Sequence, residues 1–177
     1  FASATNNIRV LDTVNKSIIR GHYAEVYRDK DSLFITKRAV AVSLQDKDSV
    51  YVHADTLQVT GKQENRILKG FYRARFFKQG SLKEEQTSGK CDSIFLNQKI
   101  GITKLLTDPV LWTGENQITG DTIHILSDTI TENLDTLKVF NNAFLIQKDS
   151  TGYNQVKRHR LNGLFTNNEL DTDNINK

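Results

Sequence analysis

Hydrophobic and polar residues alternate along most of the chain, which is the pattern of β-strands with one buried face. A short unit recurs in which Asp is followed by Ser or Thr and then by a branched aliphatic residue. In most copies a second aliphatic residue follows two places later, so both aliphatic side chains fall on one face of a strand. Asp, Ser and Thr close turns onto the backbone, so each unit predicts a strand entry after a corner. The copies begin at Asp12, Asp31, Asp48, Asp55, Asp92, Asp121, Asp128 and Asp135.

Glycines separate segments of strand length, and no stretch carries the apolar stripe of an amphipathic helix. Pro109 stands directly before Val110, Leu111 and Trp112, a position that the first residue of a strand tolerates. The Asp units recur at irregular intervals, which excludes a solenoid of fixed period. We therefore predict one all-β domain of many short strands over residues 1–170, followed by a polar tail over residues 171–177.

The composition adds that the hydrophobic core is lean. The chain has 177 residues, of which 37% are hydrophobic, and on the usual count roughly 40% are apolar against about 45–50% in ordinary domains. No window approaches the length of an apolar membrane span, and a net charge of +3 is too small for a basic nucleic-acid-binding arm. Because the chain begins at Phe1 and holds no Met, we expect a piece or a processed form of a longer protein.

Catalytic and metal-binding patterns are missing from the sequence. The Asp residues share one repeated context, whereas a catalytic carboxylate pair needs two different environments. His22, His53, His124 and His159 lie far apart and lack the spacing of a zinc site. Cys91 has no histidine nearby to act as a base, which favours a small buried thiol over a reactive one. We therefore predict a protein that is not an enzyme and that has neither a cofactor nor a metal.

Several longer segments resemble one known family. They are Ala54–Leu57, Gly89–Ile94, Asp108–Trp112 with Gln117–Ile123, and Asn141–Phe144 with Tyr153–Val156. They are similar to the OstA-like family, the LptA-type organic-solvent-tolerance family of lipopolysaccharide transport proteins, in the form found in Bacteroidetes-type bacteria. The resemblance extends from Gly21 to Leu170, and its most specific part runs from Pro109 to Asp121.

The resemblance implies a β-jellyroll in which two antiparallel sheets fold into an open V. It also implies that lipopolysaccharide acyl chains lie between the sheets and that the protein works in the periplasm, in a bridge toward the outer membrane. The implied partners are lipopolysaccharide, through its lipid A acyl chains, and other jellyroll modules joined through edge strands. Homo-oligomerisation and outer-membrane association stay open, and we expect neither a nucleic-acid partner nor a membrane span.

Elementary energetics supports an apolar groove. Exposing an acyl chain of about a dozen methylenes to water costs about 10 kcal/mol, so a carrier needs a continuous apolar wall. Strand parity selects the inward candidates, which are Leu33, Ile35, Val50, Val52, Leu57, Val59, Ile94, Leu96, Ile123, Ile125, Leu137 and Val139. Basic residues at the rim would meet headgroup phosphates, and the candidates are Arg73, Arg75, Lys157, Arg158 and Arg160.

Two other functions stay open at this stage. One is a structural module that joins other jellyrolls edge to edge without binding lipid, because open sheets leave unpaired strand edges. The other is a carbohydrate-binding β-sandwich that uses Trp112 and neighbouring aromatic residues as a platform. A hydrolytic form of that sandwich would need two carboxylates facing one cleft.

Overall fold

The computed structural model describes residues 1–14, 16–44, 49–62, 65–79, 86–131, 133–167 and 169–171. Within these ranges the chain forms fifteen β-strands and a short 3₁₀-helix. The first strands are β1 (Ala2–Asp12), β2 (Ser17–Tyr27), β3 (Ser32–Leu44), β4 (Ser49–Thr60), β5 (Ile67–Phe71), β6 (Ala74–Lys78) and β7 (Thr87–Cys91), with the 3₁₀-helix η1 at Arg28–Lys30. The others are β8 (Ser93–Asn97), β9 (Ile102–Leu106), β10 (Val110–Thr113), β11 (Asn116–Thr119), β12 (Thr122–Ser127), β13 (Leu134–Asp149), β14 (Gly152–Thr166) and β15 (Glu169–Asp171).

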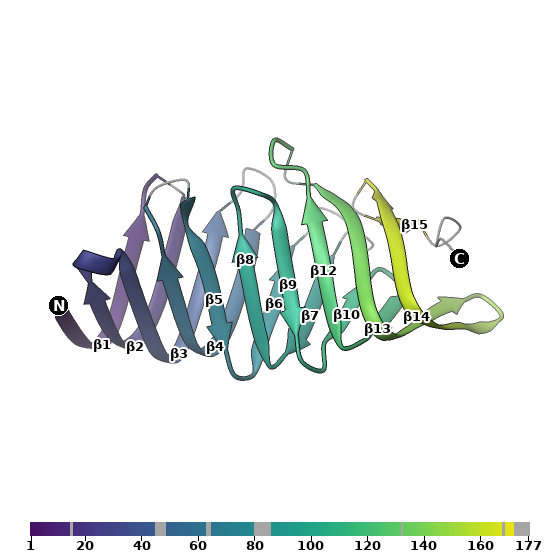
Figure 1. Cartoon of the computed structure of the whole chain (residues 1–177), viewed down its shortest axis with the longest axis horizontal. Helices are drawn as coiled ribbons and strands as arrows, with labels where there is room; N and C mark the ends of the chain where they lie inside the picture. Colours follow the sequence, from purple (N-terminus) through teal and green to yellow (C-terminus); the bar gives the residue numbers. More distant parts are fainter. Residues whose placement is uncertain are drawn as a thin grey trace.

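The strands form one antiparallel sheet that folds back on itself into two layers (Figure 1). The first half of β4 pairs with β6 and its second half pairs with β5, so β4 belongs to both layers. Likewise, the first half of β13 pairs with β12 and its second half pairs with β11, so β13 also belongs to both layers. We call β5, β8, β9 and β12 the front layer and β6, β7, β10 and β11 the back layer. The all-β V-shaped jellyroll is confirmed, and its two predicted sheets are joined through the bent strands.

Five bends of the described chain share one backbone conformation, whereas β4 bends without it. Pairs of consecutive residues adopt positive φ at each of them: Asn6 with Asn7, Lys37 with Arg38, Tyr72 with Arg73, Thr107 with Asp108, and Asn141 with Asn142. Two successive left-handed residues turn the chain sharply, which carries it from one layer into the other. We call the margin formed by these corners the spine. The corners follow one another at nearly even intervals, a repeat that the irregular Asp spacing conceals.

Three Asp units lie at the spine, as the corner hypothesis predicts. The N–H of Asp55 donates to Tyr72 O at 3.0 Å, and the N–H of Asp92 donates to Thr107 O at 3.1 Å. The N–H of Asp121 donates to the carbonyls of the next corner at 3.1 and 3.2 Å. These bonds join three Asp units to three of the corners, so backbone hydrogen bonds hold neighbouring parts of the spine together.

The strand-entry prediction is wrong for two of the Asp units. Asp12 is the last residue of β1, and Asp128 starts a turn in which Ile130 is 90% exposed. The Asp128 carboxylate accepts the N–H of Ile130 at 2.8 Å, and Asp12 accepts the N–H of Val14 at 3.1 Å. At these two positions the Asp side chain therefore closes a turn instead of starting a strand. Asp48 lies outside the described residues.

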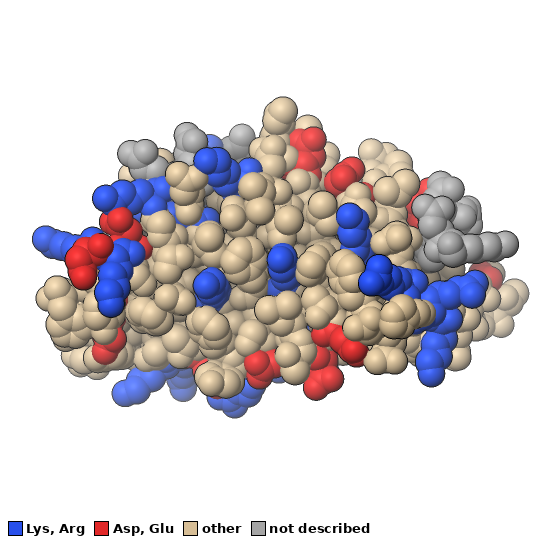
Figure 2. Space-filling model, viewed as in Figure 1, with Lys and Arg blue, Asp and Glu red and all other residues tan. Residues whose placement is uncertain are grey.

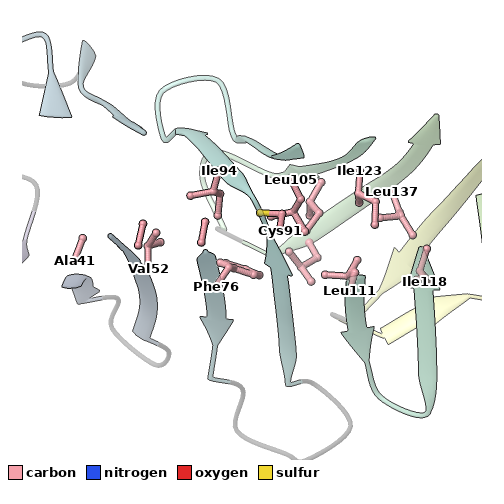
Figure 3. Packing of buried hydrophobic residues seen from close by; sticks show 14 of the residues in the cluster. Ala41, Val52, Phe76, Cys91, Ile94, Leu105, Leu111, Ile118, Ile123 and Leu137 are labelled. Carbon is pink, nitrogen blue, oxygen red and sulfur yellow. The ribbon is translucent and has the colours of Figure 1, made fainter. Parts of the chain in front are cut away.

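The hydrophobic core consists of side chains packed in the narrow space between the front layer and the back layer of strands (Figure 3). Ile94, Leu105 and Ile123 from the front layer lie opposite Phe76 and Leu111 from the back layer. A glycine keeps the layers close at one point of the core: a Cβ at Gly89 in the back layer would lie 3.0 Å from Leu105 Cδ1 in the front layer. A core of this thickness needs few residues, which explains the lean composition.

Cys91 is a buried thiol, as the sequence predicts. Its S–H donates to Ser93 O at 3.1 Å, and burial raises the pKa of the thiol to about 11.

Near the C-terminus, Asp171 is the last residue of β15, whereas the sequence predicted it as the first residue of the polar tail. Residues 172–177 lie outside the described residues.

Candidate functional site

Two adjoining cavities open between the layers, along the margin opposite the spine. Their volumes are about 150 Å³ and about 80 Å³. Both are lined by Ser43, Val50, Leu96 and Gln98, so they form one continuous depression. We call this depression the mouth groove. It runs from β2 to the start of β13.

Apolar side chains from both layers line the mouth groove. Val50 and Phe76 reach it from the back layer, and Leu96, Ile102 and Ile125 reach it from the front layer. Val50, Phe76, Leu96 and Ile125 take inward positions of their strands, and Ile102 reaches the groove from the first position of β9. The groove is therefore the partly open continuation of the core, on the margin opposite the spine.

Polar groups stand at defined places in the groove. Lys78 lines the larger cavity and is only 4% exposed. Arg66 lines the smaller cavity and forms an ion pair with Asp12. Within the described ranges, Arg66 Nε and Asn97 Oδ1 are buried and make no hydrogen bond. The apolar groove thus holds the positive charge of Lys78 and offers the Arg66 Nε–H donor and the Asn97 amide oxygen to a molecule that enters it.

The inward candidates divide into two groups. Val50, Val52, Val59, Leu96 and Ile125 line the mouth groove. The other seven face inward but pack in the deeper core or against it: Leu33, Ile35, Leu57, Ile94, Ile123, Leu137 and Val139. Parity along a strand identifies the face of a residue but not its distance from the mouth, so the sequence could not separate these groups. Contact with a ligand stays a prediction for all twelve.

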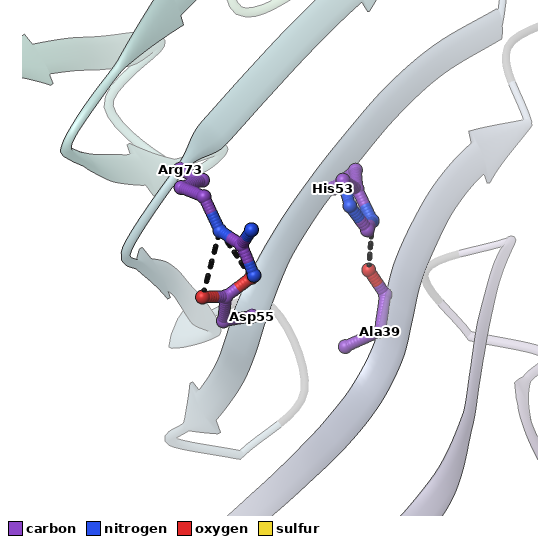
Figure 4. A network of polar contacts seen from close by, with 4 residues as sticks. All are labelled: Ala39, His53, Asp55 and Arg73. Atoms are coloured by element: carbon purple, nitrogen blue, oxygen red, sulfur yellow. Dashed lines mark hydrogen bonds and ion pairs between the residues drawn. The ribbon is translucent and has the colours of Figure 1, made fainter.

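The basic candidates lie away from the groove. Arg75, Lys157, Arg158 and Arg160 are exposed, and none of the five candidates, Arg73 included, lines either cavity. Arg73 lies at a spine corner, and its Nε and Nη2 donate hydrogen bonds to the Asp55 carboxylate at 3.0 and 2.8 Å (Figure 4). This contact raises the pKa of the guanidinium. Compact basic runs in the sequence therefore marked exposed strands rather than the groove rim.

The two basic residues that do line the groove were missed. Lys78 ends the series Ala74, Phe76, Lys78, in which every second residue of β6 is buried. That alternation was a signal in the sequence, because it places Lys78 on the inward face. Arg66 precedes β5 and carried no comparable signal, since its position depends on the ion pair with Asp12 from the distant β1.

The outer face of the front layer has a different character. Lys69, Phe95, Lys104, His124 and Lys138 are consecutive cross-strand neighbours on β5, β8, β9, β12 and β13. Figure 2 shows single basic side chains across the middle of this face, with acidic ones toward its margins. Partial burial, followed by the charges of Lys104 and Lys138, lowers the pKa of His124. This face therefore presents a spaced row of cations.

Catalytic and metal sites do not emerge from the residues that the structure describes. Among them, no group of three His, Cys, Asp or Glu side chains is placed to hold a metal ion. Of the described residues that line the mouth groove, Asp128 is the single carboxylate, so a hydrolytic carboxylate pair is not assembled there. No helix of the described part has the length and hydrophobicity to cross a membrane.

Comparison with known proteins identifies the family. The sequence profile described as "LptA/(LptD N-terminal domain) LPS transport protein" matches residues 10–131, more than half of the chain. The chain belongs to this family. The LptA/LptD N-terminal family is a transport family rather than a family of enzymes, which confirms that prediction. The match includes Pro109–Asp121, the most specific part of the resemblance, whereas the segments after Asn141 lie outside it.

A solved structure supports the same fold. LptH, titled the LptA homologous periplasmic component of the conserved lipopolysaccharide transport device from Pseudomonas aeruginosa, is similar with a TM-score of 0.58. The likeness covers 82% of this chain and 99% of LptH at 10% sequence identity. No curated protein sequence matches the chain. The narrower assignment to a Bacteroidetes-type member stays a prediction.

Proposed function

We propose that this LptA/LptD N-terminal family member shields the acyl chains of lipopolysaccharide in its mouth groove during transport through the periplasm to the outer membrane. The observation that carries the proposal is the groove itself. Val50 and Leu96 face each other across the two layers and line both cavities. An acyl chain laid along them would exchange contact with water for contact with aliphatic side chains, which is worth about 0.8 kcal/mol per methylene.

The size of the groove sets a condition on this function. An apolar cavity of about 150 Å³ holds a molecule the size of benzene, and the larger cavity has about this volume. A complete acyl chain therefore requires the V to widen at the mouth. Backbone hydrogen bonds hold neighbouring parts of the spine together, whereas the mouth is lined by side chains. Widening would separate side chains and leave the backbone hydrogen bonds intact.

The polar groups of the groove suit the polar end of such a lipid. Lys78 and Arg66 stand at the apolar trough, where an ammonium and a guanidinium would meet phosphate oxygens or ester carbonyls. Asn97 Oδ1 and Arg66 Nε, which make no hydrogen bond within the described part, would gain partners. These residues replace the exposed basic runs as our candidates for headgroup contacts.

The strand edges support a second role as an assembly module. Among the residues that the structure describes, β1 pairs with β2 alone, and β14 pairs with β13 and, over its last residues, with the short β15. Both ends of the sheet therefore offer backbone groups to a neighbouring jellyroll or to a second copy of the chain. We propose that end-to-end joining continues the groove from one module to the next.

A photo-crosslinking experiment tests lipid shielding. A photo-reactive residue is placed at Leu96 in one variant and at Phe95 in the other, in cells that produce lipopolysaccharide. The two positions are consecutive on β8, but Leu96 lines the groove and Phe95 lies on the outer face. We expect lipopolysaccharide adducts at Leu96 and not at Phe95.

The opposite results would assign the function elsewhere. Equal adducts at both positions would indicate nonspecific contact, and no adducts at Leu96 or at Val50 would contradict lipid shielding. Oligomers of the purified chain, combined with an absence of adducts, would favour the assembly role without lipid. Sedimentation velocity measures this second property independently of crosslinking.

A further inference from the structure

The outer face of the back layer carries a second depression, separate from the mouth groove. Its volume is about 490 Å³, and it lies over β4, β6, β7 and β10. Tyr51, Phe77 and Trp112 supply aromatic rings, and Arg75 and Lys90 supply positive charges. We call it the outer hollow. The strands themselves separate it from the groove, because the inward neighbours of these residues belong to the core.

Strand register explains why this surface is concave. Tyr51, Phe77, Ser88 and Trp112 are consecutive cross-strand neighbours on the four strands. The small Ser88 side chain lies between two large aromatic residues, so the surface dips at Ser88. A dip flanked by rings offers two apolar walls and a polar hydroxyl at its floor.

The rings are held in place. The ring centroids of Tyr51 and Phe77 lie 6.1 Å apart, within the range of favourable aromatic pairs. Trp112 Nε1–H donates to Gln117 Oε1 at 3.0 Å, which fixes the indole plane. Tyr51 is 38% exposed and Phe77 is 37% exposed. The rings are therefore exposed to a ligand, and their contacts hold them in one orientation.

The charge of the outer hollow has one sign. In the neighbouring row His53, Arg75 and Lys90 are cross-strand neighbours. Lys90 Nζ lies 5.7 Å from the Trp112 ring centroid, and His53 Nδ1 donates to Ala39 O at 2.8 Å (Figure 4). None of the described residues that line the hollow is acidic. The hollow is therefore complementary to an anion that also presents an apolar face.

We propose that the outer hollow binds an anionic saccharide. The C–H face of a sugar ring would pack against Trp112 and Phe77, while its carboxylate or phosphate would lie between Arg75 and Lys90. Both parts of the hollow are needed, since a bare anion would leave the rings uncovered and a neutral sugar would leave the charges unmatched. This proposal does not depend on lipid in the mouth groove.

The single tryptophan of the chain makes the test direct, because Trp112 fluorescence reports on the hollow alone. The protein is titrated with trigalacturonic acid, glucose 6-phosphate, maltose, sodium phosphate and phosphatidylglycerol vesicles. We expect a saturable fluorescence change with trigalacturonic acid or glucose 6-phosphate, which distinguishes a carboxylate from a phosphate. Maltose and sodium phosphate should bind at least about tenfold more weakly than the anionic sugar, because each lacks one of the two interactions.

Matched variants locate the site. Arg75→Gln and Lys90→Gln should each weaken binding about tenfold, and Phe77→Ala should weaken it as well. Lys104→Gln, on the outer face of the front layer, should leave binding unchanged. Leu96→Asp, which damages the groove, should also leave it unchanged. Circular dichroism confirms that each variant is folded.

Three results would overturn the proposal. One is the absence of saturable binding by both anionic sugars. Another is equal affinity for sodium phosphate or maltose, which would indicate a general anion site or a neutral-sugar site. The third is a response to vesicles alone, which would assign the hollow to a membrane surface.

Discussion

The spine and the mouth are the two margins of one V, and they are built differently. At the spine, left-handed corners turn the chain from one layer into the other, and backbone hydrogen bonds join three of these corners to Asp55, Asp92 and Asp121. At the mouth, the layers meet through side chains, and cavities remain between them. The two margins thus differ: backbone hydrogen bonds hold the layers together at the spine, and cavities lie between the layers at the mouth.

The largest expected difference between the margins is in packing. Ile94 and Leu96 occupy the same face of β8, but Ile94 is fully buried and Leu96 is half-buried at the groove. Ile94→Ala should lower the free energy of unfolding by about 2–5 kcal/mol, because it leaves a cavity in a closed core. Leu96→Ala should cost about 1 kcal/mol, because solvent reaches its site. Urea denaturation of the two variants measures both values, and equal losses would contradict the comparison.

Thiol chemistry provides the next contrast. Cys91 lies beside the spine, and its pKa of about 11 against an ordinary 9.0 leaves about a hundredfold less thiolate at pH 8. We expect Cys91 to react very slowly with a disulfide reagent, and a cysteine introduced by Ser43→Cys at the mouth to react rapidly. The unfolded chain releases the Cys91 proton first, so the thiol's contribution to stability should fall as the pH rises from 9 toward 11. Rapid modification of native Cys91 would show that the spine opens.

The smallest effect concerns the corners themselves. Thr107 has φ of 62°, an unfavourable conformation for a β-branched residue, whereas Asn141 has φ of 55°, which Asn tolerates. Thr107→Asn should therefore raise the free energy of unfolding by about 0.5–1 kcal/mol, and Asn141→Thr should lower it by a similar amount. Thermal unfolding of both variants measures the changes. Changes of the same sign would argue against strain at the corners.

The alternating pattern predicted the strands and their buried faces because period two is a local property. Ile35, Leu57 and Ile123 were correctly placed inward for this reason. The spine was not predicted, since Lys37, Arg38, Tyr72 and Arg73 are not residues typical of left-handed backbone. Their conformation is imposed by pairing with neighbouring strands, which is a tertiary effect.

The sequence predicted only part of the candidate site, because the groove also depends on how the strands assemble. Val50 and Leu96 were selected by parity, but the groove exists because their strand ends face each other across the layers. The alternation in β6 could have predicted that Lys78 faces inward. It could not have predicted Arg66, because the ion pair with Asp12, which is distant in the sequence, positions that side chain. Depth from the mouth is a property of the assembled V and has no counterpart in a single strand.

The even recurrence of the corners bears on how the length of such a molecule changes. The segment between two consecutive corners contributes two antiparallel strands to each layer, so the chain has the same direction at the start and at the end of the segment. Duplicating or deleting one such segment would keep every inward residue on the inward face. It would change the length of each layer by two strand spacings, about 10 Å. The length of the mouth groove would thus change in whole modules, and copy number would set its reach without any redesign of the core.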